Sequence, residues 1–156
     1  MNFDFDGTGL VAAHKHSNGG GLVADTAIVD DSVFVGPKAR VYGDARVSGN
    51  ARVSRNARVF GDARVYGNAI VSGNAIVSGN ARVFDESHVY DDARVYGHAS
   101  IFGKVCIFDK ACVFDNSSVG GQSTVGGNSI VRGHGIVQGD DIVVGDDIAD
   151  GTRYLH

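Results

Sequence analysis

The hydrophobic positions of this chain recur every six residues. Residues 41–82 read VYGDAR, VSGNAR, VSRNAR, VFGDAR, VYGNAI, VSGNAI and VSGNAR, with no insertion or deletion. A valine opens each unit, an alanine holds the fifth place, and Gly with Asn or Asp usually lies between them. An α-helix has a period of about 3.6 residues and an isolated strand a period of about 2. A repeat of six therefore indicates a chain that winds into coils.

The pattern extends well beyond this stretch, because every sixth residue from position 23 to position 143 is Val or Ile, in 21 consecutive units. Alternate side chains of a strand face opposite sides, so the aliphatic residue and the Ala are predicted to point inward. The Gly or Asp that follows is expected to form a corner with positive φ, and the next Asn or Asp to bond that corner's own backbone. Pro37 is expected at a corner of different shape, because its φ is held at about −65°.

Three six-residue sides close a triangular coil of 18 residues, so the 21 units predict about seven coils in an all-β, single-stranded parallel β-helix. At about 4.8 Å per coil the stack is roughly 34 Å long. We expect an N-terminal cap over residues 1–21, because the first coil would otherwise leave an open sheet edge. The β-helix is predicted over residues 22–148 and a C-terminal tail over residues 149–156.

The last coils are predicted to be open to water. Asp141 and Asp147 fall on inward positions, where a buried carboxylate would be costly, so we expect these charges to blunt the sheet edge. The isoleucines that point outward near this end need cover, which Tyr154 and Leu155 are expected to provide.

Composition limits the classes of function. The chain has 156 residues, of which 43% are hydrophobic, and its 23 glycines against one proline do not fit a mixed globular domain. A net charge of −4 argues against a nucleic-acid partner, and no apolar run approaches the roughly 18 residues of a membrane span. The N-terminal segment lacks a signal peptide's apolar run, so we expect a cytoplasmic protein. Cys106 and Cys112 fall on neighbouring faces and are predicted to be free thiols.

The repeat resembles the hexapeptide-repeat superfamily, whose fold is the left-handed parallel β-helix, over residues 23–148. The opening HSNGGGLVADTA followed by VGPKARVYGDARV is also similar to bacterial and phage hexapeptide proteins of undefined function. The resemblance implies the left hand of the winding, which the period does not specify. It also implies a homotrimer about the long axis and, as the location, the cytoplasm of a bacterial or phage-infected cell.

Residues 18 apart share a face, and the second of the three faces carries a ladder of Arg46, Arg64 and Arg82 beside the rings of Tyr66 and Phe84. An anionic small molecule would find both positive charge and stacking surfaces there. The alternative, which we favour, is a solvated surface on which guanidinium groups stack on neighbouring rings and acidic corner residues balance the charge.

The third face has one arginine and the most apolar members, so we expect the trimer contact there, with the first face as the alternative. The expected contact residues are Phe34, Ile70, Tyr90, Phe108, Ile142 and Val144.

Histidine is the first candidate for catalysis, because the resemblance includes acyltransferases that use acetyl-CoA with a histidine as general base between subunits. His88 matches that role by position, since it projects from the third face. No long loop interrupts the coils, and a uniform prism offers few concave sites. No metal site is expected: His98 and His134 lie two coils apart, and the C-terminal aspartates are split between inside and outside. His14 and His16 are expected to be solvated loop residues.

We therefore predict a non-catalytic rigid β-solenoid that acts as a trimeric structural or binding scaffold and needs no cofactor. Two alternatives stay open. One is an acyltransferase that uses acyl-CoA with His88 as base, and the other is a protein that sequesters an anionic ligand or nucleotide through Arg46, Arg64 and Arg82.

Overall fold

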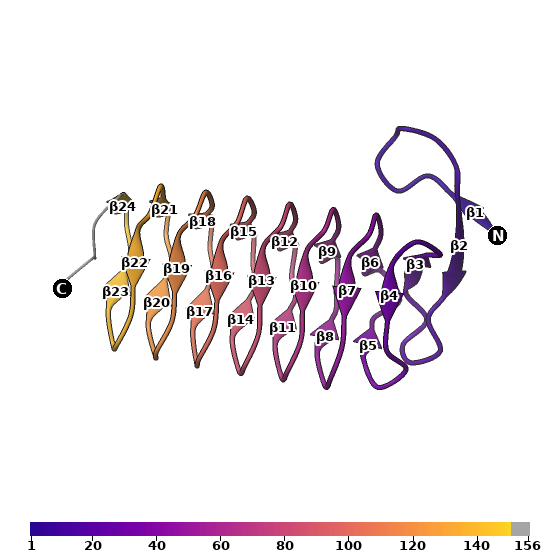
Figure 1. The fold of residues 1–156 in the computed structure, drawn as a ribbon, viewed down its shortest axis with the longest axis horizontal. Coiled ribbons are helices and arrows are strands. Elements are labelled where there is room, and N and C mark those ends of the chain that lie inside the picture. Colours follow the sequence, from indigo (N-terminus) through magenta and orange to yellow (C-terminus); the bar gives the residue numbers. More distant parts are fainter. Residues whose placement is uncertain (151–156) are drawn as a thin grey trace.

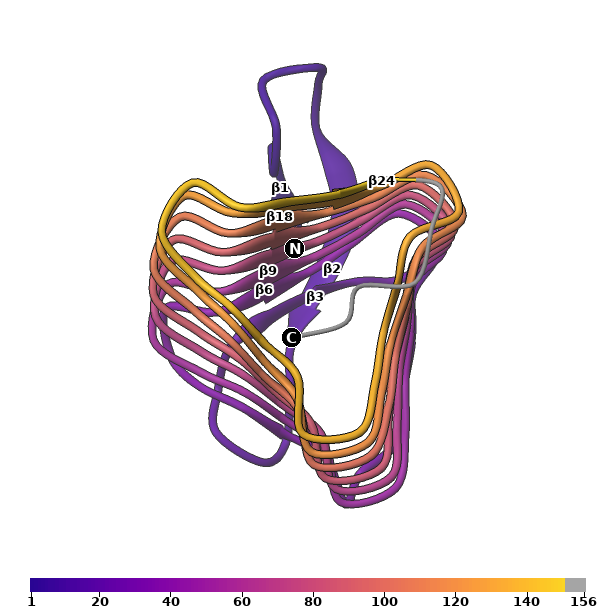
Figure 2. The ribbon, with the colours of Figure 1, turned by 90° about the vertical axis from the view of Figure 1, so that its left-hand side faces the viewer.

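A computed structural model describes residues 1–150 and shows short β-strands wound around one long axis (Figure 1). Three sheets run along this axis and form the sides of a triangular outline (Figure 2). The described residues contain no helix, and so none with the length and hydropathy to cross a membrane. The predicted all-β parallel solenoid of about seven 18-residue coils is confirmed. Its left-handed winding stays a prediction of the family resemblance.

The three sheets correspond to the three faces of the sequence analysis. The first sheet contains β1 (Asn2–Phe3), β2 (Val11–Lys15), β3 (Leu22–Ala24), β6 (Arg40–Val41), β9 (Arg58–Val59), β12 (Ile76–Val77), β15 (Arg94–Val95), β18 (Cys112–Val113), β21 (Ile130–Arg132) and β24 (Ile148–Asp150). The second contains β4 (Ile28–Val29), β7 (Arg46–Val47), β10 (Arg64–Val65), β13 (Arg82–Val83), β16 (Ser100–Ile101), β19 (Ser118–Val119) and β22 (Ile136–Val137). The third contains β5 (Phe34–Val35), β8 (Arg52–Val53), β11 (Ile70–Val71), β14 (His88–Val89), β17 (Cys106–Ile107), β20 (Thr124–Val125) and β23 (Ile142–Val143).

The interior consists of rows of aliphatic residues. Val65 on β10 pairs in parallel with Val47 and Val83, and all three are fully buried. The alanine that closes each unit is buried as well, as at Ala69. One branched and one small residue per side fill the narrow coil, and their burial supplies the hydrophobic stabilisation of the stack.

Serine replaces the inward alanine at four buried positions. Each of these hydroxyl groups donates a hydrogen bond to the carbonyl oxygen three residues earlier, so none is left without a partner in the interior. The four are Ser87, Ser117, Ser123 and Ser129.

The corners have positive φ from residue 43 onward, as predicted. The corner glycines have φ between 63° and 74°, and Arg55 adopts the same conformation with φ of 55°. The prediction of positive φ is wrong for the first two corners, because Asp25 and Asp31 lie outside the left-handed region, as Pro37 does. The hydroxyl groups of Thr26 and Ser32 in these corners donate to carbonyl oxygens of the next coil. In later coils a backbone N–H makes the equivalent bond.

The polar corner side chains bond between coils, whereas the sequence predicted bonds within a single corner. The amide of Asn56 donates to Asn74 over 3.3 Å, and Asn74 donates in turn to Asp92 over 3.2 Å. The carboxylate of Asp85 accepts the N–H of Gly103 over 2.9 Å. These bonds run along the axis and add to the backbone ladder that holds one coil on the next.

The N-terminal residues lie against the first coils. Strands β1 and β2 form an antiparallel hairpin, and β2 pairs antiparallel with β3 (Figure 1). The hairpin projects beyond one side of the triangle (Figure 2). The ring of Phe5 stacks on Tyr42 with centroids 4.9 Å apart, and Val35 of β5 exchanges backbone hydrogen bonds with Asn18 and Gly21. Residues 1–21 thus occupy the edges of the first and third sheets at this end.

At the other end, β24 continues through Asp150, two residues into the expected tail, and Ala149 is buried. The carboxylate of Asp141 accepts the backbone N–H of Gln138 over 3.3 Å and is partly exposed, in keeping with an end open to water. Tyr154 and Leu155, which were expected to cover the outward isoleucines, lie outside the described residues.

Candidate functional site

The arginine ladder predicted on the second face exists. Arg46, Arg64 and Arg82 lie on neighbouring strands in parallel register and are all exposed. Beside them, the rings of Tyr66 and Phe84 are parallel within 2°, with centroids 4.9 Å apart. The stacking follows from the fold, since side chains 18 residues apart must lie one coil apart along the sheet.

Two of the three arginines of this ladder, Arg46 and Arg64, share a groove with two carboxylates but form no ion pair with them. Within residues 1–150, no carboxylate oxygen lies within 4.0 Å of the guanidinium groups of Arg46, Arg64 or Arg82. A groove of about 250 Å³ contains Asp44 and Asp62 together with Arg46 and Arg64, so these four side chains sum to zero formal charge. The two carboxylates offset the charges of Arg46 and Arg64 and so reduce the attraction of this part of the ladder for a polyanion.

His88 lies on β14 between Ile70 and Cys106 of the adjacent strands and is half-buried. Its imidazole makes no side-chain hydrogen bond or ion pair with any residue in the described part of the chain. A catalytic histidine base is ordinarily oriented through its second ring nitrogen. Residues 1–150 of a single chain provide no such orienting group for His88.

The expected interface residues share the third face but differ in exposure. Phe34, Ile70, Tyr90 and Phe108 are half-buried, whereas Ile142 and Val144 are 44% and 43% exposed. Their surroundings explain part of this difference. The guanidinium of Arg52 lies 4.9 Å from the centroid of the Phe34 ring, and Tyr90 stacks on Phe108 at 5.4 Å. Burial raises the pKa of the Tyr90 hydroxyl above its usual value.

Exposed apolar side chains are not confined to the third face. Ile136 on the second face and Ile148 on the first are 40% and 53% exposed, so all three sides carry such residues near the C-terminal end. Ile28 on β4 is 57% exposed at the opposite end. Exposure alone therefore does not single out one face as an interface.

The two cysteines lie on different sheets, Cys106 on β17 and Cys112 on β18, and both are free. Within residues 1–150, no three His, Cys, Asp or Glu side chains come together in a group that could hold a metal ion. Near the C-terminus, Asp146 instead accepts a hydrogen bond of 3.3 Å from Asn128.

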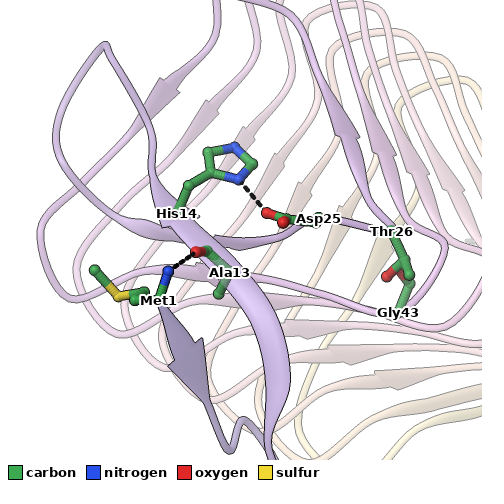
Figure 3. Close-up of polar contacts among 6 residues, drawn as sticks. All are labelled: Met1, Ala13, His14, Asp25, Thr26 and Gly43. Atoms are coloured by element: carbon green, nitrogen blue, oxygen red, sulfur yellow. Dashed lines mark hydrogen bonds and ion pairs between the residues drawn. The ribbon is translucent and has the colours of Figure 1, made fainter.

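Sequence reasoning missed the contacts of the two N-terminal histidines. His14 Nδ1 lies 2.7 Å from Asp25 Oδ1 and links β2 to the first corner of the solenoid (Figure 3). His16 is 5% exposed, and its Nε2 donates to the carbonyl oxygen of Val33 over 2.8 Å, so the expectation of a solvated residue is wrong. Nothing in the local pattern signals these contacts, because the hairpin lies outside the repeat and its partners are distant in sequence.

The fold and the side-chain ladders define this protein as a hexapeptide-repeat-like parallel β-solenoid. In agreement, the family model of the YdcK beta solenoid repeat matches residues 39–55, 45–61, 57–73 and 63–79, which lie in the most regular part of the chain. Comparisons with curated proteins and with solved structures found no match.

Proposed function

We propose that this protein is a non-catalytic scaffold: a rigid solenoid that presents ladders of side chains at a fixed spacing and forms trimers through its third face. The observation that carries the proposal is the uninterrupted stacking. Between β3 and β24, no segment longer than four residues separates consecutive strands, and each strand pairs with the strand one coil away. Such a prism holds its outward residues in a constant geometry but has no loop to fold over a reactive centre.

The trimer is supported by the apolar character of the third face, which carries the exposed Ile142 and Val144 and, further along, the stacked rings of Tyr90 and Phe108. Burying such a row against identical chains would remove apolar area from water, at about 25 cal/mol per Å².

Light scattering of the purified protein tests this assembly. We expect a mass of three times 16.2 kDa, and dissociation when Ile142→Lys places a charge in the contact. Ile136→Lys is the matched control, because Ile136 has similar exposure but lies on the second face. A mass near 16.2 kDa for the unmodified chain would overturn the trimer.

A calorimetric titration with acetyl-CoA tests the non-catalytic part. We expect no binding, because no long loop covers a site between β3 and β24, and no acyl transfer, because His88 has no orienting partner within residues 1–150. Binding that survives His88→Ala together with turnover that this variant loses would establish the acyltransferase alternative instead.

The same calorimetric titration with a nucleotide in place of acetyl-CoA tests whether the arginine ladder sequesters an anionic ligand. We expect Arg64→Ala to leave nucleotide binding unchanged, because Asp44 and Asp62 offset the charge of the groove. A binding signal that Arg64→Ala removes would place a ligand site on the second face and refute the purely structural role of that ladder.

A further inference from the structure

The row of aromatic rings on the first face is interrupted once. Tyr42 stacks on Phe60 with centroids 4.7 Å apart, and Tyr96 stacks on Phe114 at 4.8 Å, with interplanar angles of 8° and 2°. Ser78 occupies the equivalent position, or rung, of the coil that lies between these two stacks. Backbone hydrogen bonds from Phe60 to β12 and from Ser78 to β15 establish that the three rungs are consecutive. One ring is therefore missing from a ladder that is otherwise stacked.

The missing rung leaves a groove of about 310 Å³, within the range of about 300–1,000 Å³ typical of small-molecule sites. Its lining residues are Phe60, Ile76, Ser78, Arg94, Tyr96 and Cys112. Two rungs at about 4.8 Å each separate the flanking rings by roughly 10 Å. Because rings in this row stack at 4.7 and 4.8 Å, one planar ring entering the groove would stack on Phe60 on one side and on Tyr96 on the other.

A single positive charge lies at the edge of this groove. Arg94 is exposed, and within residues 1–150 no carboxylate oxygen approaches its guanidinium within 4.0 Å. Its neighbours on the adjacent strands are Ile76 and Cys112, so no other arginine lies directly beside it. An unpaired guanidinium next to a stacking slot favours a ligand that carries an anionic group.

We propose that the groove at Ser78 binds a planar aromatic ring that carries an anionic group, with the chemistry of a nucleoside monophosphate. The ring lies between Phe60 and Tyr96, the anion contacts Arg94, and the hydroxyl of Ser78 bonds a polar atom at the ring edge. This site is separate from the arginine ladder of the second face and from the third-face contact, so it goes beyond the proposed scaffold function.

The chain contains its own control for this site. The six residues IVSGNA occur twice in succession, at 70–75 and at 76–81. Ser72, in the first copy, projects from the third face, where its neighbouring rungs are Ser54 and Tyr90. A ring flanks Ser72 on one side only, so the same local sequence forms no slot there.

Isothermal titration with adenosine 5′-monophosphate as the probe tests the proposal. We expect binding to the unmodified protein, a loss of affinity of at least about tenfold in Ser78→Tyr, whose ring fills the slot, and no change in Ser72→Tyr. Arg94→Gln should weaken adenosine 5′-monophosphate about fivefold and leave adenosine unaffected. Ribose 5-phosphate, which has no ring, should not bind.

The Ser78→Tyr variant is expected to fold, because tyrosine occupies the equivalent rung at Tyr42 and Tyr96, and circular dichroism checks this. The absence of binding to the unmodified protein overturns the site, as does unchanged affinity in Ser78→Tyr. If that variant fails to fold, an unchanged affinity for adenosine 5′-monophosphate in Arg94→Gln overturns the site.

Discussion

The contact between corners of successive coils makes Gly79 a sensitive test of how the solenoid is held together. Gly79 has φ of 65°, and a Cβ atom there would lie 2.8 Å from the backbone nitrogen of Gly97, one coil further on. Gly139 has nearly the same φ, 67°, but a Cβ atom there meets no atom of residues 1–150 within 4 Å. Alanine at both positions therefore separates the cost of the backbone conformation from the cost of the contact.

The expected magnitudes follow from these geometries. The left-handed conformation costs a residue with a Cβ about 1–2 kcal/mol, and the lower entropy of alanine in the unfolded chain offsets about 0.4–1 kcal/mol. Gly139→Ala should thus cost about 1 kcal/mol. Moving the backbone of the next coil adds about 1–3 kcal/mol, so Gly79→Ala should cost about 2–4 kcal/mol. At about 2–4 °C per kcal/mol for a chain of this size, the melting temperature of Gly79→Ala falls by about 4–16 °C.

Aspartate at the same position should be milder than alanine. Four corners with positive φ already carry aspartate, and their carboxylates accept the N–H of the residue one coil on, as Asp85 does from Gly103 over 2.9 Å. Gly79→Asp should gain the same bond to Gly97 and recover about 1 kcal/mol.

Thermal melts followed by circular dichroism measure all three variants. Equal losses in Gly79→Ala and Gly139→Ala would refute the role of the intercoil contact. An aspartate variant no more stable than the alanine variant would refute the compensating hydrogen bond.

Three further predictions concern the interior and the aromatic row. Val65→Asp buries an unpaired charge in a fully buried row and should abolish the cooperative melt, with a loss above about 3 kcal/mol. Ser117→Ala should change the melting temperature by less than about 4 °C, because alanine fills the equivalent position in other coils and the carbonyl oxygens of Phe114 and Val131, which accept from this hydroxyl, each also accept a backbone N–H. Burial raises the pKa of Tyr42 above its usual 10.0, so the unfolded chain loses this proton first, and stability should fall as pH rises above about 10. Urea titrations between pH 9 and 11 should show a smaller decline in Tyr42→Phe, and an equal decline would contradict this assignment.

The register and the surface rows were accessible from the sequence because the repeat is strictly periodic. Once 18 residues make a coil, the ladder of Arg46, Arg64 and Arg82 and the burial of Val65 follow without any long-range information. The N-terminal contacts were not accessible in this way. His16 is buried against Val33, and Phe5 stacks on Tyr42, through a hairpin whose docking no local period encodes.

The sequence by itself determined the 18-residue coil, its buried rows and the side chains that share each face, because each unit repeats the same local geometry. Only the tertiary structure decided where side chains of neighbouring coils leave a groove and which charges lie together in it. The 18-residue register alone places Ser78 between Phe60 and Tyr96, and Ser72 between Ser54 and Tyr90, but only the structure shows that a groove opens at Ser78. Likewise, only the structure showed that Asp44 and Asp62 share a groove with Arg46 and Arg64 without an ion pair. Stacking and charge balance depend on distances between side chains of different coils, and these distances exist only in the folded chain.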